Sequence, residues 1–257
     1  MINNVKNIDI DKLREGVFFA ARGGGVKSSS SIGVLKALEE ENIPIIGMSG
    51  ESGSSLVTAL FAYGYNAEEI RRLFIEYSDP ISKAAKIYGG RGSIVIEELI
   101  NKVTDSTLMK NLPRKCWINA CQGRLLKPKL YLFSNTDTPD ETLGFACSAS
   151  AGLPVLYGNT YKEINGKRTA LFDGGLLYNP YIPDDVEHPI IYSSFLNSFD
   201  YPKYIPFLQK PVDASLEVAD VIITTPVGKS MITGDSEMIE GLIEEGYRQA
   251  KKVLCRK

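Results

Sequence analysis

The sequence predicts an α/β domain with a central, mainly parallel or mixed sheet that is flanked by helices on both faces. Two consecutive segments, residues 16–41 and 43–61, support this prediction. Each begins with a short apolar strand and continues through a glycine- and serine-rich turn into a helical pattern. Strands that alternate with helices in this order are typical of a parallel sheet. The fold class therefore follows from the first part of the chain.

The spacing of apolar residues predicts the other elements. Helices are expected where apolar residues recur every three or four positions, at residues 70–77, 96–103 and 239–253. Strands are expected at the short apolar runs 117–121, 129–133, 190–193 and 221–225. No linker or internal repeat interrupts this order. Residues 1–257 are therefore predicted to form one domain, with its characteristic motifs between residues 16 and 182.

The composition excludes several classes of function. Lys and Arg total 29 against 31 Asp and Glu, so the chain lacks the basic excess of a nucleic-acid-binding domain. His188 is the only histidine, which excludes a metal site built from several histidines. The four cysteines are too sparse for a disulfide scaffold or for closely paired zinc ligands. We therefore expect no metal, no cofactor and no nucleic-acid partner.

The sequence also bears on location. No segment has the pattern of a signal peptide or of a membrane-spanning helix, so a cytoplasmic location is expected and peripheral membrane contact is left open. Residues 195–211 are rich in aromatic residues and prolines. Two interpretations apply to this segment: an interfacial loop that places rings among lipid head groups, or a loop that packs over the core.

The first motif is Gly50-Glu51-Ser52-Gly53-Ser54, between a predicted strand and a predicted helix. A serine on such a sharp turn lies above the sheet edge at the start of a helix, where the helix dipole favours developing negative charge. Ser52 is therefore a candidate nucleophile, and its small neighbours form the turn. The alternatives are an ordinary helix N-cap role for Ser52 and a second frame centred on Ser49.

The second motif is Gly23-Gly24-Gly25-Val26-Lys27, which follows the first predicted strand. Consecutive glycines let several backbone N–H groups point toward one anion, either a phosphate or an oxyanion. A phosphate loop anchored on Lys27 would need glycines where Ala21 and Val26 stand, and a dinucleotide fingerprint would need one at Ser28. These mismatches argue against a nucleotide site.

The third motif is Asp173-Gly174-Gly175. An aspartate at a strand end before two glycines can approach another backbone closely, although the same tripeptide on its own is more often a simple turn. Its significance therefore depends on the other two motifs.

Taken in order, these motifs and the small-residue stretch Ala149–Pro154 resemble the patatin-like phospholipase family over about residues 16–182. The resemblance implies a lipid acyl hydrolase with a serine–aspartate dyad, in which Ser52 is the nucleophile and Asp173 the general base. It also implies that backbone N–H groups of residues 23–27 form the oxyanion hole. The substrate would be an acyl ester of a phospholipid or a related lipid, and such a dyad needs no histidine.

Four residues depart from the usual pattern of the family. Ser28 and Ser54 stand where glycine is usual, and Lys27 stands where arginine is more frequent. Glu51 places a carboxyl group beside the nucleophile, where small uncharged residues are usual, and a carboxylate there would disfavour an oxyanion. These departures bear on the catalytic rate more than on the fold.

Several alternatives remain open. A Ser52–Asp173–His188 triad would follow the chain order of the α/β-hydrolases. The same residues could act on smaller acyl substrates, as an esterase or an acyltransferase. A catalytically weak lipid-binding or regulatory protein could keep the fold, and the departures at Ser28, Glu51 and Ser54 favour that interpretation. The oligomeric state is also open.

Overall fold

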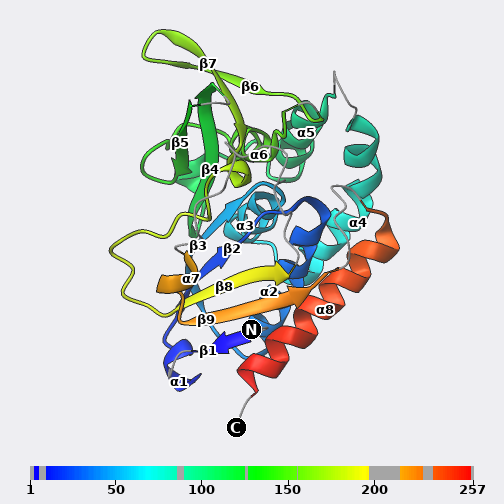
Figure 1. The fold of residues 1–257 in the computed structure, drawn as a ribbon, viewed down its shortest axis with the longest axis vertical. Helices are drawn as coiled ribbons and strands as arrows, with labels where there is room; N and C mark the ends of the chain where they lie inside the picture. Colours follow the sequence, from blue (N-terminus) through cyan, green and yellow to red (C-terminus); the bar gives the residue numbers. More distant parts are fainter. Residues whose placement is uncertain are drawn as a thin grey trace.

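Within the described part of the chain, nine strands form one sheet at the centre of the molecule (Figure 1). The computed structural model describes residues 3–5, 10–85, 90–124, 127–154, 156–196, 215–227 and 234–255. The strands are β1 (Asn3–Val5), β2 (Val17–Ala21), β3 (Ile45–Glu51), β4 (Lys115–Arg124), β5 (Lys127–Ser134), β6 (Thr160–Ile164), β7 (Lys167–Asp173), β8 (Ile190–Leu196) and β9 (Val221–Pro226). They lie in the order β1-β9-β8-β2-β3-β4-β7-β6, and β5 pairs with β4 outside this path.

The middle of the sheet is parallel and its two ends are antiparallel. β2 pairs in parallel with β3 and β8, β3 with β4, and β8 with β9. β1, β5, β6 and β7 join the sheet in antiparallel pairs. The prediction of a mainly parallel or mixed sheet is confirmed, and the six predicted strands correspond to β2, β3, β4, β5, β8 and β9.

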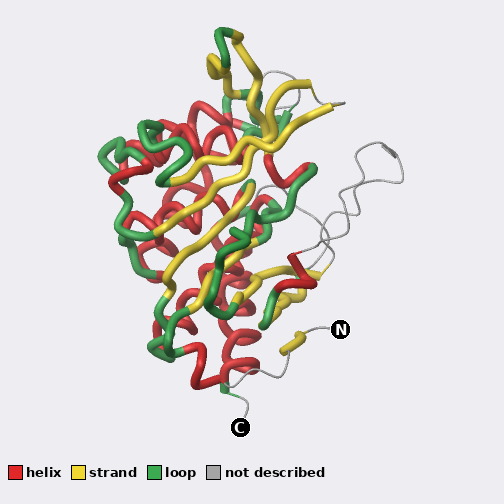
Figure 2. Tube along the Cα trace, turned by 90° about the vertical axis from the view of Figure 1, so that its left-hand side faces the viewer, coloured by secondary structure: helices red, strands yellow, loops and turns green. Residues whose placement is uncertain are grey.

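Most of the helices lie on one side of this sheet (Figure 2). These helices are α2 (Ser30–Glu40), α3 (Gly53–Tyr63), α4 (Ala67–Ala84), α5 (Gly92–Val103), α6 (Leu143–Ala151) and α8 (Ser236–Leu254), while the short α1 (Ile10–Leu13) precedes β2. The opposite face is covered by α7 (Ser215–Val218) and by a loop whose Ile182 and Val186 pack against the cluster around Phe18. Both faces therefore carry helices, as predicted, but unequally. Right-handed connections from β2 to β3 and from β3 to β4 step across the sheet in one direction, which puts α2 and α3 on the same side.

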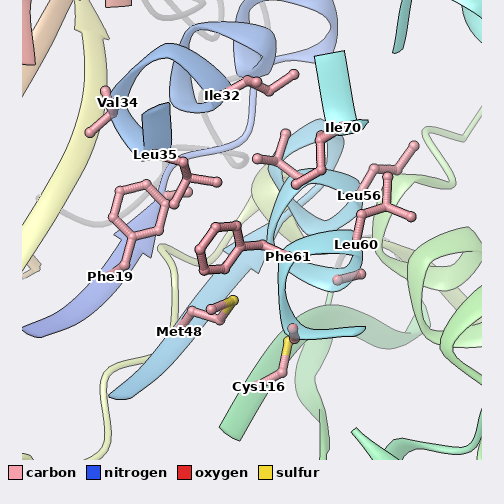
Figure 3. Packing of buried hydrophobic residues seen from close by; sticks show 14 of the residues in the cluster. Phe19, Ile32, Val34, Leu35, Met48, Leu56, Leu60, Phe61, Ile70 and Cys116 are labelled. Atoms are coloured by element: carbon pink, nitrogen blue, oxygen red, sulfur yellow. The ribbon is translucent and has the colours of Figure 1, made fainter. Parts of the chain in front are cut away.

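The main hydrophobic core lies between the sheet and this helix layer (Figure 3). Phe19 of β2 and Met48 of β3 point toward Leu35 of α2 and Phe61 of α3. The last helix, α8, joins the same core through residues such as Ile243. The core therefore connects the beginning and the end of the chain.

Strand β6 and helix α6 are among the elements that apolar spacing in the sequence does not mark. Strand β6 reads Thr-Tyr-Lys-Glu-Ile and alternates between half-buried and exposed positions, so no apolar run identifies it. Helix α6 is buried on nearly all sides and built largely from small residues, so its apolar residues show no helical period. Tertiary contacts, and not local pattern, decide both elements.

Candidate active site

Ser52 lies on the sharp turn between β3 and α3, as the sequence predicts. Its backbone has φ 50° and ψ −131°, a sparsely populated conformation that costs a non-glycine residue about 1–3 kcal/mol. The neighbouring glycines leave room for the turn. A Cβ on Gly50 would lie 2.4 Å from Thr58 Oγ1, and a Cβ on Gly53 would lie 2.5 Å from the carbonyl oxygen of Gly25. The turn thus places Ser52 beyond the end of the sheet, at the start of α3.

The order of pairing along β4 brings Asp173 to this turn. On one edge of β4, residues 115–119 pair with β3 up to its last residue, Glu51. The next residue of β4, Ala120, pairs with Asp173, the last residue of the antiparallel strand β7. Because β5 occupies the other edge of β4, strands β3 and β7 share one edge and meet end to end. Ser52 and Asp173 therefore reach the same point from opposite directions.

A hydrogen bond joins the two side chains. Ser52 Oγ donates to Asp173 Oδ2 across 2.7 Å, and the N–H of Gly175 donates to the other carboxylate oxygen, Oδ1, across 2.8 Å. Asp173 is only 5 % exposed. The backbone therefore holds one carboxylate oxygen while the other accepts the hydrogen bond from the Ser52 hydroxyl, which is the geometry that general-base chemistry requires.

Helix α6 and the turn after it contact both residues. The N–H of Ser52 donates to Ser150 Oγ across 2.9 Å, and the N–H of Asp173 donates to the carbonyl oxygen of Gly152 across 3.0 Å. No sequence motif predicts a contact for Ser150 or Gly152. The signal that could have found them is the run of small residues in which they lie, because such a run allows close backbone approach.

Tyr157 lies near Asp173 and belongs to none of the sequence motifs. Its side chain is buried. Burial and, second, the negative charge of Asp173 raise the pKa of Tyr157 to about 12. The phenol therefore stays protonated near the carboxylate at neutral pH.

The glycine turn approaches Ser52 from the end of β2. A Cβ on Gly23 would lie 2.6 Å from the Cβ of Ser52 and 2.4 Å from the carbonyl oxygen of Glu51, so only glycine fits there. The rest of the motif continues as a short 3₁₀ helix, η1 (Gly25–Ser29), which contains Val26 and Lys27. The structure therefore brings all three sequence motifs to one place.

The two serines that replace family glycines are both accommodated. Neither Ser28 nor Ser54 has a positive φ, so a side chain is tolerated at both positions. Ser54 Oγ donates to the carbonyl oxygen of Arg22 across 2.6 Å, and the N–H of Gly24 donates to Ser28 Oγ across 3.1 Å. The Ser28 hydroxyl adds a hydrogen bond within the glycine turn, and the Ser54 hydroxyl connects the start of this turn to the elbow, the turn at residues 50–54 that carries Ser52.

Lys27 is buried under the ring of Phe195. Lys27 is 4 % exposed, and its Nζ lies 5.7 Å from the centre of the ring. Burial and, second, the positive charge of Arg22 lower the pKa of Lys27. Phe195 itself is also buried, so this ring packs over the site.

The remainder of the aromatic segment lies outside the described residues from position 197 to position 211. The interfacial-loop interpretation of that segment therefore stays a prediction. No helix in the described ranges combines the length and the apolar character needed to cross a membrane.

The structure separates His188 from Ser52 and Asp173. His188 lies just before β8, and its ring is near Gly16, where β2 begins. β2 and β8 run parallel, with Phe18 opposite Ile190. The histidine therefore lies at the strand starts, whereas Ser52 and the glycine turn lie at the strand ends. A Ser52–Asp173–His188 triad is not assembled.

A serine on a strand-to-helix elbow, hydrogen bonded to a buried carboxylate, is an arrangement typical of serine acyl hydrolases on α/β folds. The family profile described as "Patatin-like phospholipase" matches residues 20–184, which are 165 of the 257 residues. The chain belongs to the patatin-like phospholipase family. The resemblance inferred from the motifs is thus confirmed over nearly the same range.

Solved structures share the fold. VipD from Legionella pneumophila superimposes with a TM-score of 0.60 at 13 % identity, over 93 % of this chain and 67 % of that chain. ExoU, in its complex with SpcU from the type III secretion system of Pseudomonas aeruginosa, gives 0.55 at 14 % identity, over 93 % of this chain and 51 % of that chain. This chain therefore spans about half the length of ExoU. A search of curated proteins gives no significant match.

Proposed function

We propose that this protein is a lipid acyl hydrolase that cleaves acyl esters of phospholipids or related lipids through an acyl-Ser52 intermediate. The observation that carries the proposal is the 2.7 Å hydrogen bond from Ser52 Oγ to Asp173 Oδ2 on a strained elbow. Membership of the patatin-like phospholipase family supports a lipid ester as the substrate class.

The proposed reaction has two halves. Ser52 Oγ attacks the ester carbonyl carbon while its proton passes to Asp173, and the tetrahedral intermediate collapses as the bond to the lipid alcohol breaks. Asp173 returns the proton to the departing alcohol. In the second half a water molecule gives its proton to Asp173 and attacks the acyl carbonyl. Ser52 then leaves with that proton and the fatty acid is released.

The negative oxygen of each tetrahedral intermediate needs fixed donors. In this proposal they come from the glycine turn at residues 23–27. The N–H of Gly23 already donates to Glu51 and that of Gly24 to Ser28. We therefore assign the oxyanion to the N–H groups that follow, those of Gly25 and Val26.

The deciding experiment compares wild type with Ser52→Ala and Asp173→Asn on para-nitrophenyl esters and mixed phospholipids. Loss of the general base is expected to lower kcat by about 10²- to 10⁴-fold, and Ser52→Ala to abolish turnover. Ser49→Ala is the matched control, because Ser49 is buried on the same strand and its hydroxyl has no hydrogen-bond partner among the described residues. Circular dichroism checks folding. Full activity of folded Ser52→Ala, or loss of activity in Ser49→Ala, would contradict the assignment.

A catalytically weak lipid-binding protein is the second candidate. The contact between Gly23 and the Glu51 carboxyl group favours this candidate. The contact places a carboxyl group beside Ser52 and occupies one N–H group of the glycine turn. Vesicle binding without cleavage of any ester would support this candidate. Cleavage of short esters only would instead favour an esterase or acyltransferase. For the lipid acyl hydrolase, we also propose a cytoplasmic location with peripheral membrane contact.

A further inference from the structure

Glu51 is the last residue of β3 and directly precedes Ser52. Side chains alternate along a strand, and Gly50 faces α3, so the Glu51 side chain points to the opposite face of the sheet. It is fully buried. Removing a carboxyl group from water is costly unless hydrogen-bond donors reach it, so its surroundings are informative.

The glycine turn and the Asp173 turn lie on either side of this carboxyl group. The N–H of Gly23 donates to Glu51 Oε1 across 3.3 Å. A Cβ on Gly175 would lie 3.5 Å from Glu51 Cδ and 3.2 Å from the Cβ of Ser52. Glu51 therefore lies between the turn assigned to the oxyanion and the turn whose N–H group orients Asp173.

We propose that Glu51 is a positioning residue, which holds the Gly23 N–H and thereby the start of the glycine turn in place beside Ser52. The inference rests on the proposed function and adds to it a residue that acts through Gly23 without touching substrate. Donors stabilise an oxyanion only when they are fixed before the reaction. A displacement of about 1 Å can cost about 100-fold in rate.

The contact requires an acceptor oxygen and does not require a charge. Glutamine keeps the shape of the side chain and a carbonyl oxygen for Gly23. It also removes any negative charge near the developing oxyanion. Leucine has a similar volume but no acceptor, so the Gly23 N–H would lose its partner. Comparing Glu51→Gln with Glu51→Leu therefore distinguishes the effect of losing the acceptor oxygen from the effects of losing the charge or changing the volume.

Steady-state kinetics on a para-nitrophenyl ester tests this role. Glu51→Gln is expected to match or exceed the kcat of wild type. Glu51→Leu is expected to lose about 10- to 100-fold in kcat with little change in KM, because the turn is displaced and the binding surface is not. Wild-type kcat in Glu51→Leu would overturn the proposal. An equal loss in Glu51→Gln would also overturn it, since the charge and not the acceptor would then matter.

A second measurement does not depend on activity. Amide hydrogen exchange at Gly23, followed by NMR, is expected to accelerate in Glu51→Leu and to stay slow in Glu51→Gln. The amide of Leu35 in α2 serves as the control for folding. Unchanged exchange at Gly23 in Glu51→Leu would overturn the positioning role. Altered exchange in a protein that cleaves no ester would contradict only the proposed function.

Discussion

At the scale of single residues, the site depends on a glycine as much as on its polar side chains. In the proposed mechanism Ser52 and Asp173 supply the reactive groups, and they can meet the glycine turn only because Gly23 has no side chain. Ser150 Oγ adds a third contact by accepting the N–H of Ser52. These groups lie so close together that small changes of side-chain volume at the site are expected to have large effects.

Gly23→Ala is expected to abolish ester hydrolysis and to lower stability by about 1–3 kcal/mol. Its Cβ would lie within 2.6 Å of the Ser52 Cβ, so the turn or the elbow must move. The measurement is kcat together with urea unfolding. Gly241→Ala is the control, because nothing lies within 4 Å of a Cβ at that position. A fully active Gly23→Ala protein would show that the turn does not approach Ser52 as described.

At the scale of elements, the close contact between α2 and α8 stabilises the position of α2, the helix that follows the glycine turn. A Cβ on Gly246 of α8 would lie 2.0 Å from the carbonyl oxygen of Ser30, and a Cβ on Gly33 of α2 would lie 1.9 Å from that of Ile243. The two backbones therefore come close at these points, where each glycine faces the backbone of the other helix. Because α2 follows η1 directly, the packing of α8 holds the helix that continues from the glycine turn.

Two glycines of α8 provide a matched pair of substitutions. Gly246→Ala is expected to destabilise the fold by about 1–3 kcal/mol, since its Cβ would press on the backbone of α2. Gly241→Ala, on the open side of the same helix, is expected to stabilise it by about 1 kcal/mol through helix propensity. Thermal unfolding measures both, at about 2–4 °C per kcal/mol. Shifts of the same sign would contradict the packing of α8 on α2.

At the scale of the whole molecule, one core spans most of the chain. The main cluster begins with Leu13 and ends with Leu254, and it includes residues from β2, β3, β4, β7, β8 and β9. A smaller cluster around Phe18 and Tyr192 covers the opposite face of the same strands. Both clusters pack against strands of the same sheet, and the single domain stays a prediction that an unfolding experiment can test.

We therefore expect one cooperative unfolding transition in urea. Trp117 is the only tryptophan, and it packs against Phe18 on the face opposite the main helix layer, with ring centres 5.7 Å apart. Its fluorescence reports that face, while far-ultraviolet circular dichroism reports mainly the helices. Coincident transitions are expected. Two separated transitions would contradict a single domain.

The sequence predicted the elements that bear a local pattern. The apolar runs of β2 and β3 and the spacing in α8 follow from burial on one face, so periodicity reveals them. Strand β6 and helix α6 escaped prediction because neither shows that period. The prediction of helices on both faces holds, but the sheet order decided that nearly all of them share one face.

By itself, the sequence predicted the fold class and resembled the family closely enough to imply a candidate dyad, because each motif is a short stretch of the chain. Only the tertiary structure decided which groups meet. Ser52 and Asp173 are 121 residues apart and come together because β3 and β7 share one edge of β4. The burial of Glu51 against Gly23 has the same origin. Contacts of this kind depend on strand order and register, which no short segment of sequence encodes.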